Sequence, residues 1–160
     1  MRTLLIVLLV TSLVAPVSGQ GTAPRQPFTI VIKAERPSVK AGTGVWVNVN
    51  LTNTSNQDID TSANISSLTG IDPNFVFDVR DAAGNLVPKI VYEHPELADG
   101  KLIMDRLIKP KESLIEQEEV SRLYDMSRPG QYLIQVSRPV SKNKKDDVVK
   151  SNKITLTVTP

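Results

Sequence analysis

The chain has 160 residues, of which 40% are apolar, no cysteine and a formal charge of +2, a composition that suits one globular domain with its own core. The near-even charge excludes a general attraction to nucleic acid or to an anionic membrane, so we expect no nucleic-acid partner. Because cysteine is absent, no disulfide holds the fold, and its stability has to come from the core.

The first residues have the pattern of a secretory signal peptide. Arg2 gives a basic start, Leu4 to Val14 is an apolar run, and Val17-Ser18-Gly19 supplies small residues before a cleavage site. The apolar run is too short for a comfortable membrane span, and no other stretch is long enough. We therefore predict an exported protein, periplasmic or extracellular, without a membrane span in the mature chain. Its predicted parts are a signal peptide over residues 1–19, a flexible lead-in over 20–27 and one domain over 28–160.

Alternating apolar residues predict the strands of this domain. The first strand is Phe28–Lys33, with Phe28, Ile30 and Ile32 directed inward. A turn-rich bridge, Arg36–Gly44, leads to the clearest strand, Val45–Thr52. One face of that second strand is aliphatic and the other is polar apart from one tryptophan. The inward residues are Val45, Val47, Val49 and Leu51, and the outward residues are Trp46, Asn48, Asn50 and Thr52.

The middle of the chain has more polar turns. Asn53–Gly70 predicts a loop with one short edge strand, and Phe75–Arg80 predicts a strand with Phe75, Phe77 and Val79 inward. A hairpin turn at Asp81–Asn85 leads into a return strand, where Pro88 indicates a sheet edge or a bulge. The remaining predicted segments are the return strand Leu86–Tyr92, strands at Lys101–Ile108, Ser113–Glu118 and Ile154–Thr159, one helical turn within Glu119–Met126, and a charged hairpin loop at Ser141–Asp147.

A corner near the C-terminal end indicates the fold class. Pro129-Gly130 signals a turn into a strand in which Tyr132, Ile134 and Val136 share one face. This is the position of the tyrosine corner of immunoglobulin-like sandwiches, where the ring packs inward and the hydroxyl bonds to upstream backbone. With about seven or eight strands separated by polar turns, the predicted fold is all-β, an immunoglobulin-like antiparallel β-sandwich.

Three stretches carry a family resemblance: Val47–Ser55, Phe77–Asn85 and Leu123–Tyr132. Together they resemble bacterial secreted immunoglobulin-like domains. The order of signals is similar to the amino-terminal domain that precedes the catalytic domain of deuterolysin-like, lysine-specific metallopeptidases, and more distantly to the intracellular proteinase inhibitor family of bacilli. The resemblance covers most of Phe28–Pro160 and implies a β-sandwich. Because such a metallopeptidase needs a His-Glu-x-x-His helix and this chain has one histidine, the resemblance implies an accessory domain without the enzyme.

The residue inventory predicts no enzyme, no metal and no cofactor. His94 is the only histidine, whereas a zinc site needs three or four ligands. There is no Gly-x-Ser-x-Gly nucleophile elbow, and the recurring carboxylates lack the calcium-loop pattern, so we interpret them as a solvated face. Those carboxylates are Asp58, Asp60, Asp78, Asp81, Glu116, Glu118 and Glu119. The Asn-x-Ser/Thr matches at Asn50, Asn53 and Asn64 are interpreted as chance, and Lys142, Lys144 and Lys145, followed by two aspartates, as a solvated loop.

Trp46 is the predicted partner-binding residue, because it lies on the polar face of its strand. An exposed tryptophan can stack on a sugar or anchor a protein partner, so a protein or glycan partner is expected, unless a neighbouring loop covers the ring. We therefore predict an exported, non-enzymatic binding or interaction module. The alternative is a proteinase inhibitor acting through an exposed loop, for which Glu93–Gly100 and Gly70–Asn74 are the candidates. The sequence leaves the oligomeric state open.

Overall fold

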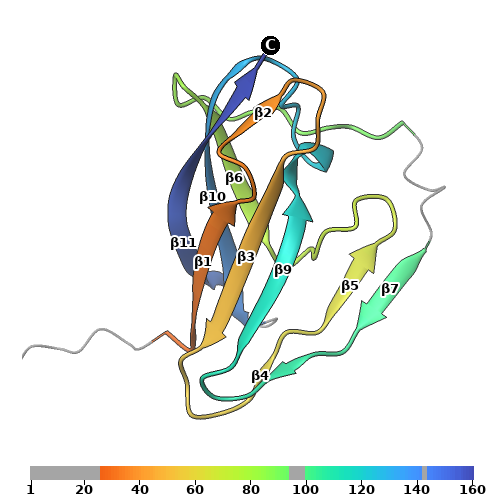
Figure 1. Cartoon of the computed structure of the whole chain (residues 1–160). Coiled ribbons are helices and arrows are strands. Elements are labelled where there is room, and N and C mark those ends of the chain that lie inside the picture. Colours follow the sequence, from red (N-terminus) through yellow and green to blue (C-terminus); the bar gives the residue numbers. More distant parts are fainter. Residues whose placement is uncertain (1–25, 94–99, 142–143) are drawn as a thin grey trace, which may run out of the picture.

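The computed structural model describes residues 26–93, 100–141 and 144–160, and it is an all-β sandwich (Figure 1). The predicted signal peptide and the first part of the lead-in lie outside these ranges. The last two lead-in residues are bonded to the domain, since the carbonyl of Gln26 accepts from Thr54 Oγ1 and that of Pro27 from the amides of Thr54 and Ser55. Within the described ranges, no helix is long and apolar enough to span a bilayer.

The first sheet contains β1 (Phe28–Ala34), β3 (Trp46–Asn53) and β9 (Ser113–Glu119) in the order β1-β3-β9, all antiparallel. The burial of β3 alternates strictly along the strand, as the sequence predicted, with its valines and Leu51 inward. The register places Val31, Asn50 and Ile115 in one row across the three strands. This row and every second row on either side of it form the outward side of the sheet.

The second sheet has the order β2-β11-β10-β6. Its strands are β2 (Ser38–Lys40), β11 (Lys144–Thr159), β10 (Gly130–Ser141) and β6 (Val76–Asp81). All pairs are antiparallel except β2 with β11, which is parallel. An immunoglobulin sandwich places its A, B and E strands in one sheet and its C, F and G strands in the other. Here β1, β3 and β9 take the first set of places, and β6, β10 and β11 the second.

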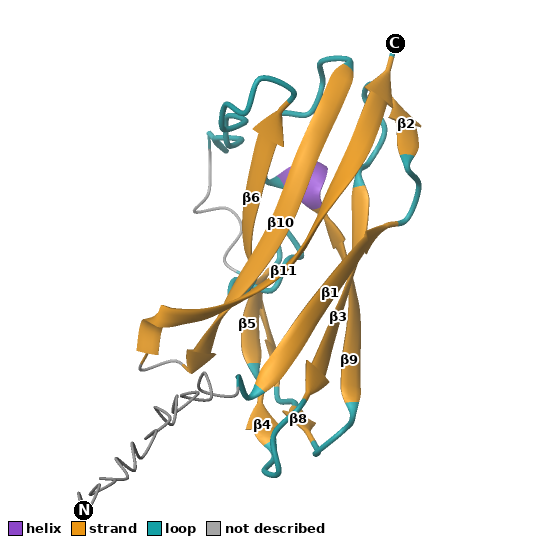
Figure 2. Cartoon of the chain, turned by 90° about the vertical axis from the view of Figure 1, so that its left-hand side faces the viewer, coloured by secondary structure: helices purple, strands orange, loops and turns teal. Residues whose placement is uncertain are grey.

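The core lies between the two sheets (Figure 2). One buried cluster contains Ile134 and Val136 of β10 together with Val47 and Val49 of β3. Branched aliphatics dominate that cluster, as expected for pleated, half-buried surfaces. Where β1 runs beside β11, the side chain of Asn152 accepts from the amide of Ile32 at 2.8 Å and donates to its carbonyl at 3.1 Å. These two bonds connect the sheets at that side.

Two short ladders lie beside β9 (Figure 1). They pair β4 (Ile59–Asp60) with β8 (Leu107–Ile108) and β5 (Ala63–Ser66) with β7 (Lys101–Met104). The prediction of one continuous strand over Lys101–Ile108 is therefore wrong. The chain bends at Arg106, whose amide donates to Ser62 Oγ and whose carbonyl accepts from the amide of Thr61. The bend turns the Arg106 side chain toward β9.

Other boundaries also differ from the predicted ones. Leu86–Tyr92 is not a strand: it makes isolated bridges at Leu86 and Lys89, and its Pro88 carbonyl accepts from the amide of Asp125. The bridge Arg36–Gly44 contains β2. The hairpin loop predicted at Ser141–Asp147 is mostly strand, because Ser141 already pairs with Lys144. The predicted helical turn is present as the 3-10 helix η2 (Val120–Arg122).

Candidate functional site

Trp46 lies on the outward side of the first sheet, as the sequence predicted, and its side chain is half-buried. We call this side the outer face. It consists of the outward residues of three strands: Thr29, Val31 and Lys33 of β1, Trp46, Asn48, Asn50 and Thr52 of β3, and Ser113, Ile115, Gln117 and Glu119 of β9. Of these residues, only Lys33 and Glu119 carry a charge. The outer face is therefore mainly a surface of amides and hydroxyls.

The absence of a side chain at Gly44 lets the side chains of Trp46 and Glu119 lie close to its backbone. A Cβ atom at Gly44 would lie 2.8 Å from Trp46 Nε1 and 2.8 Å from Glu119 Oε1. Since real Cβ atoms do not approach that closely, the missing side chain is what leaves room for the indole and the carboxylate. Trp46 and Glu119 are also direct partners in the β3–β9 ladder. The glycine thus brings an aromatic N–H and an anionic oxygen to one end of the outer face.

Two hollows in the surface lie on either side of Gly44. One of about 250 Å³ is lined by Glu35, Arg36, Val39, Thr43, Gly44 and Trp46. The other, of about 300 Å³, shares Thr43 and Gly44 with the first and continues past Glu119 to Ser121 and Asp125. We call Glu35, Arg36, Thr43, Gly44, Trp46 and Glu119 together the Trp46 shelf. The sequence indicated only Trp46 of these residues. The other five come from three segments of the chain, 35–36, 43–44 and 119, which only the fold brings together.

The shelf is attached to the ordered strands. The carboxylate of Glu119 pairs with Arg122 Nε at 2.7 Å, and the amide of Glu35 donates to the carbonyl of Trp46. The first residues of η2 return to the start of β3, where Ser121 Oγ accepts from the amide of Val45 and the amide of Val120 donates to its carbonyl. These bonds hold Glu119 beside the ring of Trp46 before any ligand arrives.

The predicted corner is a structural feature distant from the shelf. Tyr132 is buried and its Oη donates to the carbonyl of Arg128 at 2.7 Å, four residues upstream, which is the bond that a tyrosine corner makes. Pro129 and Gly130 lie exposed at the turn. Burial raises the pKa of the Tyr132 phenol. A second buried tyrosine, Tyr124, donates its hydroxyl to the carbonyl of Phe77, a contact that the sequence did not indicate.

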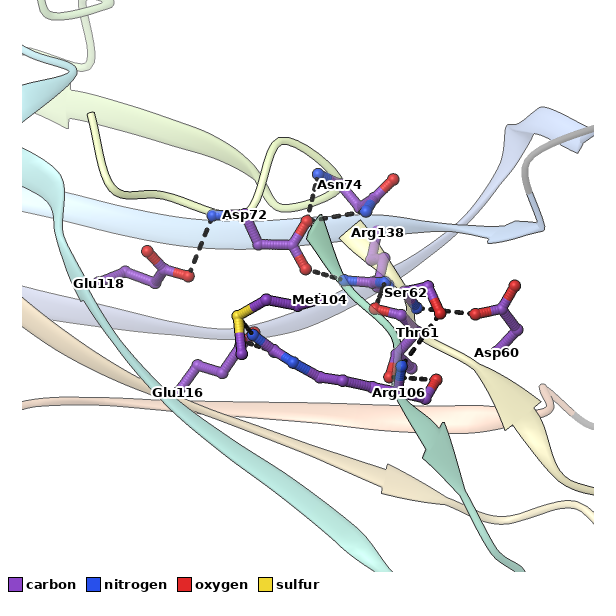
Figure 3. A network of polar contacts seen from close by, with 10 residues as sticks. All are labelled: Asp60, Thr61, Ser62, Asp72, Asn74, Met104, Arg106, Glu116, Glu118 and Arg138. Atoms are coloured by element: carbon purple, nitrogen blue, oxygen red, sulfur yellow. Dashed lines mark hydrogen bonds and ion pairs between the residues drawn. The ribbon is translucent and has the colours of Figure 1, made fainter. Parts of the chain in front are cut away.

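A charged network lies inside the sandwich (Figure 3). Asp72 Oδ2 pairs with Arg138 Nη1 at 2.9 Å, and both side chains are buried. Arg138 also donates through Nη2 to the carbonyl of Thr61 at 3.3 Å and stacks on the ring of Phe75. The other oxygen of Asp72 accepts from the amide and the side chain of Asn74. The guanidinium thus links β10 to the segment between β4 and β6.

Two glutamates of β9 point into the same region. Glu118 is 3% exposed and its Oε1 accepts from the amide of Asp72 at 3.4 Å. Glu116 forms an ion pair with Arg106, and both of these side chains are largely buried. The prediction of a solvated carboxylate face is therefore wrong for Glu116 and Glu118. The charge of Glu116 is compensated by Arg106, whereas Glu118 has no arginine partner of its own among the described residues, and Asp58 and Asp78 are exposed as predicted.

Glu118 has an unusually high pKa. Burial is the main cause, because it raises the pKa of this carboxyl from 4.5 to about 7. The hydrogen bond from the amide of Asp72 opposes this rise, the Asp72 carboxylate reinforces it, and the Arg106 guanidinium opposes it. No group of three or more histidine and carboxylate side chains in the described ranges is arranged to hold a metal ion.

The other predicted features have mixed outcomes. His94 and most of the loop Glu93–Gly100 lie outside the described residues. The second inhibitor-loop candidate, Gly70–Asn74, is not an exposed loop, because Ile71 and Asp72 are buried. Asn53, one of the three glycosylation matches, is also buried, and its amide nitrogen donates to the carbonyls of Gln57 and Ile108. The inhibitor alternative therefore stays a prediction without a described loop to support it.

Comparison with known proteins adds little to this description. No protein-family model matches the chain, and no curated protein matches it. Among solved structures, it is similar to a β-glucosidase from Erythrobacter marinus, with 17% sequence identity and a TM-score of 0.42. The match covers 81% of this chain and 15% of the glucosidase. A likeness at this level carries no argument about function.

Proposed function

We propose that this protein is an exported, non-enzymatic binding module whose contact surface is the outer face, with the Trp46 shelf at one end. The observation that carries the proposal is a half-buried tryptophan on a sheet face with few charges, where the tryptophan lines one hollow and a second hollow begins at the adjoining Gly44. Aromatic residues held in this way are typical anchors of binding surfaces. Export rests on the signal-peptide pattern of residues 1–19.

The scaffold beneath the outer face supports this role. Directly under it lie the inward residues of β3, Val47, Val49 and Leu51, which are fully buried in the common core. Outward side chains can therefore be changed without removing a core residue. A rigid face of this kind reduces the entropy that ordering a contact surface would otherwise cost.

The test is a retention assay with wild-type protein and two variants. The exported protein is incubated with a panel of insoluble polysaccharides and immobilised surface proteins, and the bound fraction is measured. We expect Trp46→Ala to lose retention on whichever material retains the wild type. Leu86→Ala, which removes an exposed apolar side chain beside β6, is the matched control and keeps retention. Circular dichroism and urea unfolding check that both variants are folded.

The outcome that contradicts the proposal is equally specific. If folded Trp46→Ala protein is retained as well as the wild type on every material, the Trp46 shelf is not the contact surface. If the variant does not fold, Gly44→Ala replaces it, because that change displaces the indole and the Glu119 carboxylate without removing the tryptophan itself.

A further inference from the structure

We propose that the ligand of the outer face is a neutral oligosaccharide, with one sugar ring at the Trp46 shelf and further units along the amides of β3 and β9. This inference rests on the proposed function and specifies its ligand class. It follows from the charge of the outer face, from its hydrogen-bonding groups and from the size of the hollow beside the indole.

The charge of the outer face favours an uncharged ligand. Glu119 is neutralised by its ion pair with Arg122, which leaves Lys33 as the charged group facing outward between the three strands. At the Trp46 shelf, Glu35 and Arg36 add one charge of each sign, so neither sign predominates. A polyanion or polycation finds no complementary row of charges here, whereas a neutral polyol needs none.

The polar groups match the hydroxyls of a sugar chain. Asn48, Asn50 and Gln117 each present an amide that both donates and accepts hydrogen bonds, as every sugar hydroxyl does. Asn48 and Gln117 are partners across the β3–β9 ladder, so their amides lie next to each other. Asn50 Oδ1 has no hydrogen-bond partner among the described residues, but it is buried, so we do not count it as open to a ligand. The amides of half-buried Asn48 and exposed Gln117 are therefore the groups that we expect to bond the sugar hydroxyls.

The Trp46 shelf supplies an aromatic surface, which the amides of the outer face do not provide. The C–H face of a pyranose ring is apolar and packs on an aromatic ring, and the hollow beside Trp46 adds Glu35, Arg36 and Thr43 as polar partners. Its volume is about 250 Å³, below the roughly 300–1,000 Å³ of usual small-molecule pockets. The hollow therefore suits one ring of a chain, and the rest of the chain lies on the open sheet.

A protein partner fits these observations less well. The centre of a protein interface is usually apolar and aromatic. Here the central positions are Asn48 and Asn50, and the one tryptophan lies at an end of the outer face. Val31 and Ile115 are exposed, but they flank Asn50 instead of meeting each other. We therefore argue for the oligosaccharide and treat the protein as an outcome of the test.

The experiment uses the single tryptophan of the chain as a local reporter. The exported protein is titrated with hexasaccharides of glucose, mannose, xylose and N-acetylglucosamine, and with an oligogalacturonate as the anionic counterpart, while tryptophan emission is recorded. We expect at least one neutral hexasaccharide to give a saturable change and the anionic one to give none. The dissociation constant should change less than about two-fold between about 0.1 and 1 M salt, because no ion pairs form.

Variants that keep the reporter test the position of the sugar. Asn48→Ala should weaken binding about 3- to 10-fold, as expected for one or two lost hydrogen bonds, and Leu86→Ala should leave it unchanged. A neutral hexasaccharide that binds Asn48→Ala and wild type equally overturns the proposed placement. If no neutral sugar changes the emission while Trp46→Ala loses retention on a surface protein, the sugar inference is overturned and the binding-module proposal stands. If no neutral sugar changes the emission and Trp46→Ala is retained on every material as well as the wild type, both proposals are overturned.

Discussion

Glu118→Gln is the substitution that examines the interior of the sandwich most directly. The carboxyl lies buried on β9 and faces the amide and carboxylate of Asp72, the guanidinium of Arg106 and, through these partners, Glu116 and Arg138. Each of the two arginines already has its own carboxylate partner. An ionised Glu118 would therefore be the surplus charge of the network. Burial disfavours this charged form and raises the pKa, and the carboxylate of Asp72 reinforces the rise.

The sign and size of the effect follow from proton linkage. The pKa is about 7 in the folded protein and 4.5 ordinarily, so between these values the folded state holds a proton that the unfolded chain has released. Stability from this group is therefore complete below about pH 4.5 and decreases as the pH rises toward about 7. The two values correspond to at most about 3 kcal/mol, and we expect about 2 kcal/mol after partial screening.

Glutamine keeps an acceptor oxygen for the amide of Asp72 and has no charge at any pH. We expect the free energy of unfolding of Glu118→Gln to match the wild type near about pH 4 and to exceed it by about 2 kcal/mol near about pH 8. Urea unfolding followed by circular dichroism at several pH values measures both curves, and Glu93→Gln, at an exposed position, is the matched control. Wild-type and Glu118→Gln curves that run parallel over this range would refute the linkage argument.

Three further changes examine separate contacts. Arg138→Leu leaves Asp72 as an unpaired buried charge and should cost about 3–5 kcal/mol, measured as a lower urea midpoint. Tyr132→Phe keeps the ring and removes its bond to the Arg128 carbonyl, so a loss of about 1 kcal/mol is expected in the same assay, and an unchanged midpoint would contradict it. Gly44→Ala places a Cβ too close to Trp46 Nε1 and Glu119 Oε1, so both side chains have to move. The indole should become more accessible to acrylamide quenching, while the free energy of unfolding changes by about 1 kcal/mol or less. Unchanged quenching would show that the position of the indole does not depend on Gly44.

The sequence predicted the elements whose pattern is local. Alternation identified β1, β3, β6, β9 and β10 with nearly the right bounds, because one face of each is apolar and the other is polar. Trp46 was assigned to the outward side by the same argument. The strand β2 was missed, since three residues carry no periodicity and its parallel partner is the far end of β11.

The buried charges could not be predicted, for a different reason. Arg138 follows Tyr132, Ile134 and Val136 at the same spacing of two, so the alternation places it inward, but polarity argues for an outward side chain. Which argument prevails depends on Asp72, whose position beside Arg138 is set by the fold. The same holds for Glu116 and Arg106. The sequence did not indicate Glu119 as part of the Trp46 shelf, because Trp46 and Glu119 become neighbours only through the β3–β9 ladder.

The interior network and the outer face depend on one another through β9. This strand is the edge of the first sheet, and an edge strand lacks hydrogen bonds on one side. Its inward Glu118 bonds the amide of Asp72, which pairs with Arg138 of β10, so β9 is tied to the opposite sheet. Its outward residues, Gln117 and Glu119, belong to the surface that we propose for binding. The β3–β9 ladder sets where Glu119 lies relative to Trp46. Buried ion pairs contribute little net stability but can favour one arrangement of the chain, and here they connect the inward side of β9 to Arg106 and, through Asp72, to β10.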